Sequence, residues 1–191
     1  AIHSIKFAEN GFLTTGLDIG LAFPSYEEGT VGYLAICIAN PIFSERAGKA
    51  RITQLQSLLE CKEFHLPPNT KCFTHGDFNQ KNILVERKSS GKMGVSAILD
   101  WEFALSGSGI MDIGNLLRFE DESRAVMSGV FADAYKNAGG VLAENWRAQA
   151  AFADILPQCN FLMEEFERPT TIRTALSVID RYISIFNKHQ T

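Results

Sequence analysis

The residue types that could carry out chemistry are concentrated in one short region of the chain. His75, Gly76 and Asp77 precede Asn82 with the spacing H-G-D-x-x-x-x-N, and Asp100 follows further along. A carboxylate can accept a proton or bind a metal ion, and an amide oxygen is a ligand for a hard cation such as Mg²⁺. The candidate site therefore lies here, and it depends on the elements that position these side chains.

Three short apolar segments frame the region. They cover 71–74, 82–85 and 95–99, and polar or glycine-containing connections separate them, which predicts three strands. The loop that carries His75 and Asp77 lies between the first two predicted strands. The polar side chains of the candidate site therefore lie at strand ends.

The last two predicted strands would form an antiparallel hairpin. With a turn centred near Gly91, facing residues have numbers that sum to about 182, so Asn82 faces Asp100. Their oxygens would meet at the open end of the hairpin, with Asp77 on the loop just before it. This arrangement suits Mg²⁺, which takes one or two carboxylates, waters and substrate phosphates. A carboxylate off the metal can accept a proton from an incoming hydroxyl group.

Each part of this pattern also has a purely structural interpretation. His-Gly-Asp is a common turn sequence, and Asp-Trp-Glu after a strand can cap a helix. The four fixed positions together, however, match a chain of this length by chance about once in a thousand cases. The joint pattern therefore favours a functional site.

The motifs resemble those of a known family. T-H-G-D-F-N-Q-K-N-I-L-V, then I-L-D-W-E-F-A and G-I-M-D-I-G-N-L, are similar to the catalytic core of the aminoglycoside phosphotransferase and choline kinase family, relatives of the protein kinases. The motifs cover about 72–117. The resemblance implies that Asp77 is the catalytic base and that Asn82 and Asp100 hold Mg²⁺ bridging the phosphates of ATP.

The same resemblance implies roles for two supporting residues and a reaction. His75 would brace the catalytic loop, and Asp112 would begin a buried helix and support the loop by hydrogen bonding. The reaction would transfer the γ-phosphoryl group of ATP to a hydroxyl of a small molecule such as an aminoglycoside, choline or a related alcohol. The acceptor itself stays open, because the helices that set specificity vary within the family.

Family members enclose the phosphates with an N-terminal β lobe that carries a glycine-containing loop and a strand lysine. Lys6 lies in a strand-like run, but no glycine-rich loop precedes it. We therefore expect the chain to correspond to the C-terminal lobe, with the nucleotide lobe apparently absent and supplied by a longer form that continues before Ala1. The chain alone is then expected to be inactive or nearly so.

The remaining sequence predicts a mainly helical α+β fold. A small hairpin over 5–7 and 12–14 would open the chain, around Asn10-Gly11. Apolar periodicity predicts helices over 33–43, 45–64, after Asp112, around 126–134, over 146–166 with a break at Pro157, and after Thr170. We expect one domain over 1–191, divided into a hairpin and helices (1–70), the catalytic loop and metal-binding hairpin (71–104) and a helical part (105–191).

Composition limits the other possibilities. The 191 residues are 46% hydrophobic and 21% charged, which is typical of a soluble globular chain, and the net charge of -4 argues against a nucleic-acid partner. No apolar run approaches the roughly 20 residues that cross a membrane. Four dispersed cysteines without a C-x-x-C pair favour a reducing, cytoplasmic location.

Two other functions stay open. A pseudokinase-like binding module would keep the fold without catalysis, and the missing nucleotide lobe favours it. A metal-dependent phosphoesterase would need more ligands than four dispersed histidines offer. Acidic residues could also line a pocket for a cationic acceptor, although such runs are more often solvated helix faces; they are Glu120, Asp121, Glu122, Glu164, Glu165 and Glu167.

Overall fold

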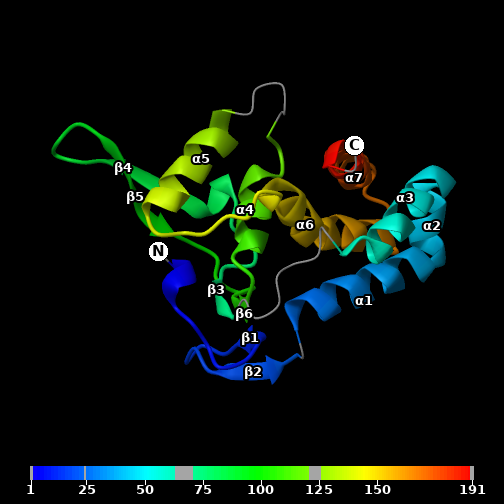
Figure 1. Cartoon of the computed structure of the whole chain (residues 1–191), viewed down its shortest axis with the longest axis horizontal. Coiled ribbons are helices and arrows are strands. Elements are labelled where there is room, and N and C mark those ends of the chain that lie inside the picture. The colour runs from blue at the N-terminus through cyan, green and yellow to red at the C-terminus, as the bar shows by residue number, and fades with distance from the viewer. Residues whose placement is uncertain (1, 24, 63–70, 121–125, 190–191) are drawn as a thin grey trace.

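Helices dominate the structure, a computed structural model that describes residues 2–23, 25–62, 71–120 and 126–189 (Figure 1). The helices are α1 (Tyr26–Ala39), α2 (Pro41–Ala47), α3 (Lys49–Glu60), α4 (Ile110–Leu117), α5 (Val126–Asn137), α6 (Trp146–Met163) and α7 (Pro169–His189). The strands are β1 (Gly11–Leu13), β2 (Ile19–Ala22), β3 (Cys72–Thr74), β4 (Ile83–Arg87), β5 (Met93–Ile98) and β6 (Leu105–Gly107). Short 3-10 turns lie at Ile2–Ser4 and Gln80–Asn82. The prediction of a mainly helical fold with small β elements is confirmed.

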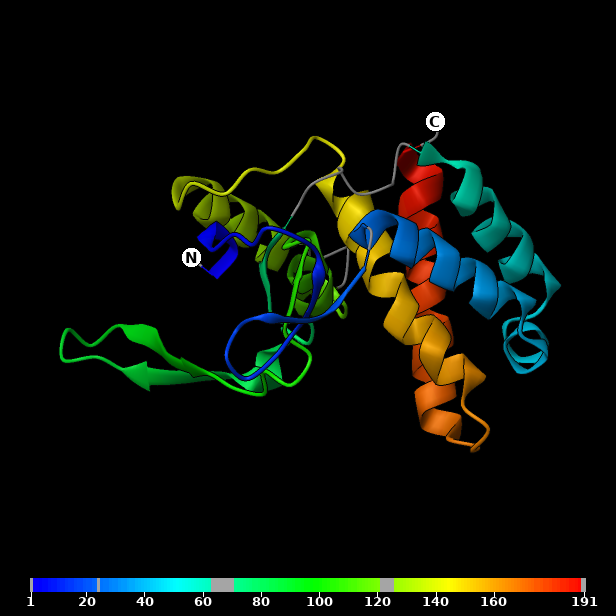
Figure 2. The ribbon, with the colours of Figure 1, turned by 90° about the horizontal axis from the view of Figure 1, so that it is seen from below.

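The main core lies among α1, α2, α3, α6 and α7, and Figure 2 shows α6 and α7 side by side. Phe43, Phe152 and Phe186 are fully buried there. Burying one such side chain contributes about 1.5–3 kcal/mol. A smaller cluster around Ile113 and Trp146 joins α4 to the start of α6. The core therefore fixes α4, which lies beside the candidate site, against the helical body.

The helices differ from the predictions at their ends. The predicted helix over 33–43 is two helices, because the side chain of Asn40 accepts hydrogen bonds from the amides of Ile42 and Phe43 and starts α2. The predicted helix over 45–64 is α3, which ends at Glu60. The sequence predicts that Pro67 and Pro68 stop this helix, because proline cannot continue one, and this pair lies outside the described residues.

The predicted break at Pro157 is wrong, because α6 continues through it. A proline removes one helical hydrogen bond and crowds the preceding turn. Eleven residues of α6 are buried, however, including Phe152, Ile155 and Leu162. Packing on this scale outweighs the loss of a single backbone hydrogen bond.

A four-stranded antiparallel sheet joins the N-terminal segment to the centre of the chain, in the order β2-β1-β6-β3. β6 was not predicted, because its three residues are all buried and show no alternation. The predicted pairing of 5–7 with 12–14 is wrong: Phe7 N–H donates to Lys71 O at 2.9 Å, and Phe73 N–H donates to Ile5 O at 3.0 Å. The segment 5–7 therefore pairs with a distant part of the chain, although the local Asn-Gly sequence favours a hairpin turn.

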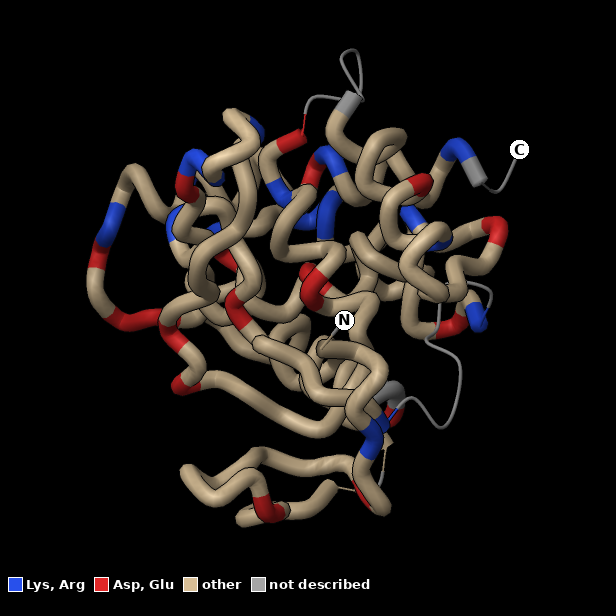
Figure 3. Tube along the Cα trace, turned by 90° about the vertical axis from the view of Figure 1, so that its left-hand side faces the viewer, with Lys and Arg blue, Asp and Glu red and all other residues tan. Residues whose placement is uncertain are grey.

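β4 and β5 form a separate two-stranded sheet that projects from the body (Figure 2). Basic and acidic residues are interspersed along the trace on the side shown in Figure 3, with no single basic face there. Within the described residues, no helix is both long and apolar enough to cross a membrane.

Candidate functional site

The loop between β3 and β4 carries the predicted catalytic residue, Asp77, and its backbone is tightly held. The Asn82 side-chain amide donates to the backbone oxygen of Asp77 at 3.0 Å and to its Oδ2 at 3.2 Å. The Asn79 amide donates to the same backbone oxygen at 3.2 Å. Asp77 and Asn82 are therefore in direct contact.

His75 lies at the base of the loop and is fully buried. Its Nδ1 accepts the backbone N–H of Asp77 at 3.2 Å, so Nε2 carries the proton and donates to the backbone oxygen of Leu99 at 2.8 Å. The ring also packs on Trp101, with 4.5 Å between ring centroids. His75 thus connects the loop that carries Asp77 to the strand end that precedes Asp100.

Gly76 occupies a position that no other residue fits without strain. Its φ is +86°, and a Cβ placed on it would lie 2.3 Å from the backbone oxygen of Phe103. The segment that follows Asp100 therefore packs directly on the bare backbone of the loop. This close approach requires glycine.

Gly76→Ala is expected to destabilise the protein by about 2 kcal/mol or more, because the left-handed backbone costs about 1–2 kcal/mol and the contact with Phe103 adds to it. Gly129→Ala is the matched control: Gly129 lies in α5, and a methyl group on its Cα would meet nothing within 4 Å. A helical glycine replaced by alanine there should add about 0.5–1 kcal/mol of stability. Urea unfolding measures both, and equal effects would contradict this account of Gly76.

Asp100 follows β5 and has a φ of +66°, which is rare for a residue other than glycine. It is exposed, and its carboxylate makes no hydrogen bond or ion pair with any described residue. The chain on either side is fixed, since Leu99 N–H donates to Asn82 O at 2.8 Å and the Trp101 indole stacks on Phe73 at 5.0 Å. The Asp100 carboxylate is thus presented to solvent from a rigid backbone.

The hairpin register differs from the prediction by one residue. Ile83 pairs with Ile98, which puts Asn82 opposite Leu99 rather than Asp100. The reason is that the turn, closed by a hydrogen bond from Lys88 N–H to Lys92 O, is centred one residue earlier than expected. A bulge after Leu84 then restores only part of the difference. Asp100 consequently lies one residue beyond the partner of Asn82.

Asp112 lies in the first turn of α4 and is 1% exposed. Its two oxygens accept the backbone N–H groups of His75 at 2.9 Å and Gly76 at 3.0 Å. Its Oδ2 also contacts Nε2 of His3 at 2.9 Å. A buried carboxylate with three donors is well compensated, and it ties α4 and the N-terminal segment to the loop.

The region that carries this site matches a known protein family. The model of the Phosphotransferase enzyme family matches residues 43–152, which is more than half of the chain and includes the whole site. The chain belongs to this phosphotransferase family. No curated protein sequence is similar enough to the chain to count as a match.

Two solved structures share the fold of this phosphotransferase-family chain. One is assigned as a fructosamine-3-kinase from Thermobifida fusca YX-ER1, with 18% identity and a TM-score of 0.55 over 92% of this chain and 60% of that one. The other is a thermostable mutant of the aminoglycoside phosphotransferase APH(4)-Ia in a ternary complex with AMP-PNP and hygromycin B, with 15% identity and a TM-score of 0.57 over 93% of this chain and 57% of that one. The chain thus spans about 60% of the length of these neighbours.

A second hydrogen-bond network supports the loop between β3 and β4. Asn115 Oδ1 accepts the backbone N–H of Phe78 at 3.2 Å, and Asn115 Nδ2 donates to Asp154 at 2.5 Å. Asp154 is fully buried, and it also accepts two hydrogen bonds from Arg118, at 2.7 and 2.9 Å, and one from the Tyr182 hydroxyl. Helices α4, α6 and α7 are therefore joined at this one carboxylate.

The charges of this network shift two pKa values. Burial by itself lowers the pKa of Arg118, but the hydrogen bonds and the charge of Asp154 outweigh it and raise that pKa above its ordinary value. Burial, then the Asp154 charge, raises the pKa of the Tyr182 hydroxyl well above its ordinary value. Arg118 therefore stays charged and Tyr182 stays neutral over the whole physiological range of pH.

The raised pKa of the Tyr182 hydroxyl should affect stability at alkaline pH. Because the folded-state pKa is raised, the hydroxyl contributes its full stability below about pH 10 and loses it as the pH rises toward the folded-state pKa, by at most about 1.4 kcal/mol per pH unit. Tyr182→Phe should therefore be less stable than wild type at pH 8, with a difference that narrows above pH 10. Urea unfolding between pH 8 and 11 checks this, and a constant difference would contradict it.

Several of these residues were missed by sequence reasoning. Asn115 lies three positions after Asp112 on the same helix face, and this spacing could have identified it. His3, Asp154 and Tyr182 are far from the loop in sequence and carry no local signal. Among the described residues, no group of three or more His, Cys, Asp or Glu side chains is arranged to hold a metal ion; a site of one carboxylate and one amide would not form such a group.

Proposed function

We propose that this chain is the C-terminal, catalytic lobe of a small-molecule kinase that transfers the γ-phosphoryl group of ATP to a hydroxyl group. The observation that carries the proposal is the hydrogen-bonded pair of Asp77 and Asn82, in a loop joined through His75 to the strand end before Asp100. Membership of the phosphotransferase family supports the reaction class. The AMP-PNP bound in one structural neighbour supports ATP as the donor.

Asp77 serves as the general base in this proposal. Its Oδ2 accepts the Asn82 amide, which leaves Oδ1 without a hydrogen bond among the described residues. Oδ1 accepts the proton of the acceptor hydroxyl while the hydroxyl oxygen bonds to the γ-phosphorus and the bond to ADP breaks. The half-buried loop orients this oxygen, since both neighbouring backbone groups of Asp77 are hydrogen-bonded.

The donor set at Asn82 and Asp100 suits Mg²⁺. Asn82 uses its Nδ2 on Asp77, so its Oδ1 is the atom that remains for a cation, and the Asp100 carboxylate is exposed and unpaired among the described residues. One carboxylate and one amide oxygen match a cation that retains waters and binds substrate phosphates. A bound Mg²⁺ would neutralise charge on the phosphate oxygens.

His75 and Asp112 act as positioning residues in this proposal, because they hold the backbone on both sides of Asp77 and touch no reacting atom. A nucleotide-binding lobe would be supplied by residues outside 1–191, and the coverage of 60% and 57% of the two structural neighbours is compatible with that. The acceptor is a small molecule with a free hydroxyl. Hygromycin B in one neighbour and the fructosamine-3-kinase assignment of the other support this class.

The proposal predicts ATP consumption that requires both Mg²⁺ and a hydroxyl acceptor. The protein should be expressed from its complete coding sequence and tested against a panel of aminoglycosides, choline, amino-acid alcohols and sugars. Asp100→Ala should lower turnover by about 100-fold or more. Even the loss of a residue that only hydrogen-bonds to a metal ligand lowers metal affinity or activity by about 10- to 100-fold. Asp133→Ala, an exposed aspartate on α5, is the control.

Equal turnover in wild type and Asp100→Ala would overturn the assignment of Asp100. Absence of Mg²⁺-dependent ATP binding by the complete protein would instead favour the non-catalytic binding module. The assay of ATP consumption detects the first result, and calorimetry with ATP in the presence of Mg²⁺ or EDTA detects the second.

A further inference from the structure

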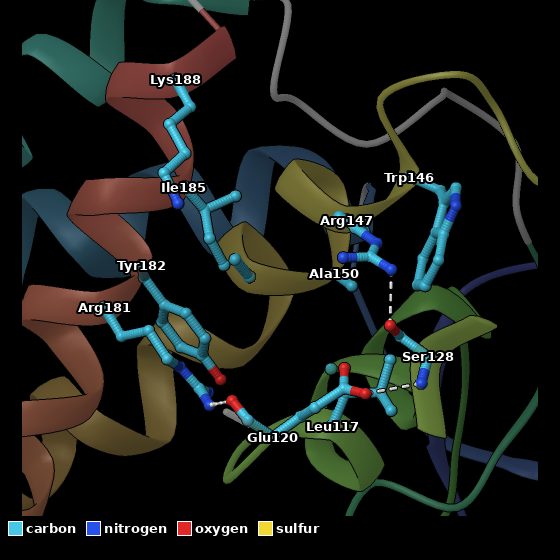
Figure 4. A pocket seen from close by; sticks show the side chains of 12 residues that line it. Leu117, Glu120, Ser128, Trp146, Arg147, Ala150, Arg181, Tyr182, Ile185 and Lys188 are labelled. Carbon is cyan, nitrogen blue, oxygen red and sulfur yellow. Dashed lines mark hydrogen bonds between the residues drawn. The ribbon is translucent and has the colours of Figure 1, made fainter. Parts of the chain in front are cut away.

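A cavity of about 270 Å³ lies between the end of α4 and helices α6 and α7 (Figure 4). Asp77, Asn82 and Asp100 do not line it. Its volume is close to the lower limit of small-molecule sites. The cavity is therefore separate from the catalytic loop, and its chemistry differs from that of the loop.

Basic side chains form one part of the cavity wall. Among the described residues of the lining, Arg147 comes from α6, Arg181 and Lys188 come from α7, and Glu120 is acidic. The Glu120 carboxylate already accepts the backbone N–H of Ser128 at 2.7 Å. Among the described residues, neither arginine has a carboxylate within ion-pair distance. Arg147 and Arg181 thus bring positive charge to the wall with no carboxylate partner among the described residues.

Arg181 is held in place by backbone oxygens rather than by an opposite charge. Its Nη1 donates to Glu120 O at 2.5 Å and its Nη2 donates to Arg118 O, whereas its Nε is buried without a hydrogen-bond partner among the described residues. A buried N–H donor without a hydrogen-bond partner is costly. An anionic oxygen close to Arg181 would offset that cost.

Most of the remaining wall is apolar. Leu117, Trp146 and Ile185 line it, and Figure 4 shows their side chains directed toward the same space as the basic groups. An acidic pocket for a cation was one interpretation of Glu120 in the sequence. The other charged residues of the described lining are basic, so the described residues favour an anion with an apolar part. Asp121 and Glu122, the two acidic residues that follow Glu120, lie outside the described residues.

We propose that this cavity binds a small molecule that combines one phosphate or carboxylate group with an apolar or aromatic portion. Arg147 and Arg181 contact the anionic group, and Leu117, Trp146 and Ile185 cover the apolar part. This proposal does not rest on the proposed kinase function, since it uses none of the residues of the catalytic loop.

The test uses phenyl phosphate as the probe and benzyl alcohol as its uncharged counterpart. Titrations of the ¹⁵N-labelled chain would be followed by NMR at the two indole N–H signals, of Trp101 and Trp146, in EDTA so that no metal-bound phosphate contributes. We expect phenyl phosphate to shift the Trp146 signal saturably while the Trp101 signal stays in place. Benzyl alcohol should bind at least tenfold more weakly. Benzoate in place of phenyl phosphate shows whether a carboxylate is preferred.

Arg147→Gln should weaken phenyl phosphate binding at least fivefold. Arg147 is exposed and hydrogen-bonds to Ser128 through one nitrogen, so its replacement should leave the fold intact. Arg173→Gln removes the same charge from an exposed position of α7 outside the cavity, and binding should stay within twofold of wild type. A Trp146 signal that does not move, equal binding of the alcohol, or unchanged binding in Arg147→Gln would each overturn the proposal.

Discussion

Asp154→Ala is expected to lower the free energy of unfolding by about 3–5 kcal/mol. Asp154 is fully buried, and Arg118, Asn115 and Tyr182 all donate to it. Its removal leaves the guanidinium group of Arg118, whose side chain is only 12% exposed, without a counter-charge. Desolvating an unpaired charge is the largest single cost that a substitution of this kind can impose.

The surface pair of Arg51 and Asp180 provides a matched control. It has comparable geometry, with nitrogen–oxygen distances of 2.6 and 2.8 Å, but the Asp180 side chain is 52% exposed. Asp180→Ala should therefore cost no more than about 1 kcal/mol. Should Asp154→Ala not fold, Asp154→Asn keeps the shape and loses only the charge, and urea unfolding should still show a larger loss than in Asp180→Ala. A loss no greater than that of Asp180→Ala would contradict the role of the network.

The local elements of the site could be predicted from the sequence because short-range patterns determine them. The strands that contain Cys72–Thr74 and Ile83–Arg87 follow from apolar runs, and the loop between them follows from its polar residues. Asn82 and Asp77 are close in sequence, so their contact needs only one turn of 3-10 helix. The family motif lies within this local unit.

The parts of the site that depend on distant segments could not be predicted in the same way. His3 contacts Asp112, which is distant in sequence, and the segment from Ile5 to Phe7 pairs with the centre of the chain rather than with 12–14. Asp154 lies on a helix whose pattern indicates burial but not a hydrogen-bonded carboxylate. The predicted hairpin register was wrong by one residue, because the turn is centred one residue earlier than expected and the bulge after Leu84 corrects only part of that difference.

Asp77→Asn is expected to lower kcat for phosphoryl transfer by about 10²- to 10⁴-fold, the usual contribution of a general base. The substitution replaces one carboxylate oxygen with an amide nitrogen and keeps the size of the side chain, so the backbone hydrogen bonds of the loop should persist. Binding of ATP with Mg²⁺ should change little, because Asn82 and Asp100 are intact. The loss should therefore appear in kcat and leave the affinity for nucleotide nearly unchanged.

The central claim, that Asp77 is the base of a kinase site, is tested most directly by measuring both quantities on one preparation of the complete protein. ATP binding by calorimetry and acceptor-dependent formation of ADP should be compared for wild type, Asp77→Asn and the exposed control Asp133→Asn. We predict that all three bind ATP with Mg²⁺ and that Asp77→Asn alone loses turnover. Turnover in Asp77→Asn within a few-fold of wild type would contradict the claim.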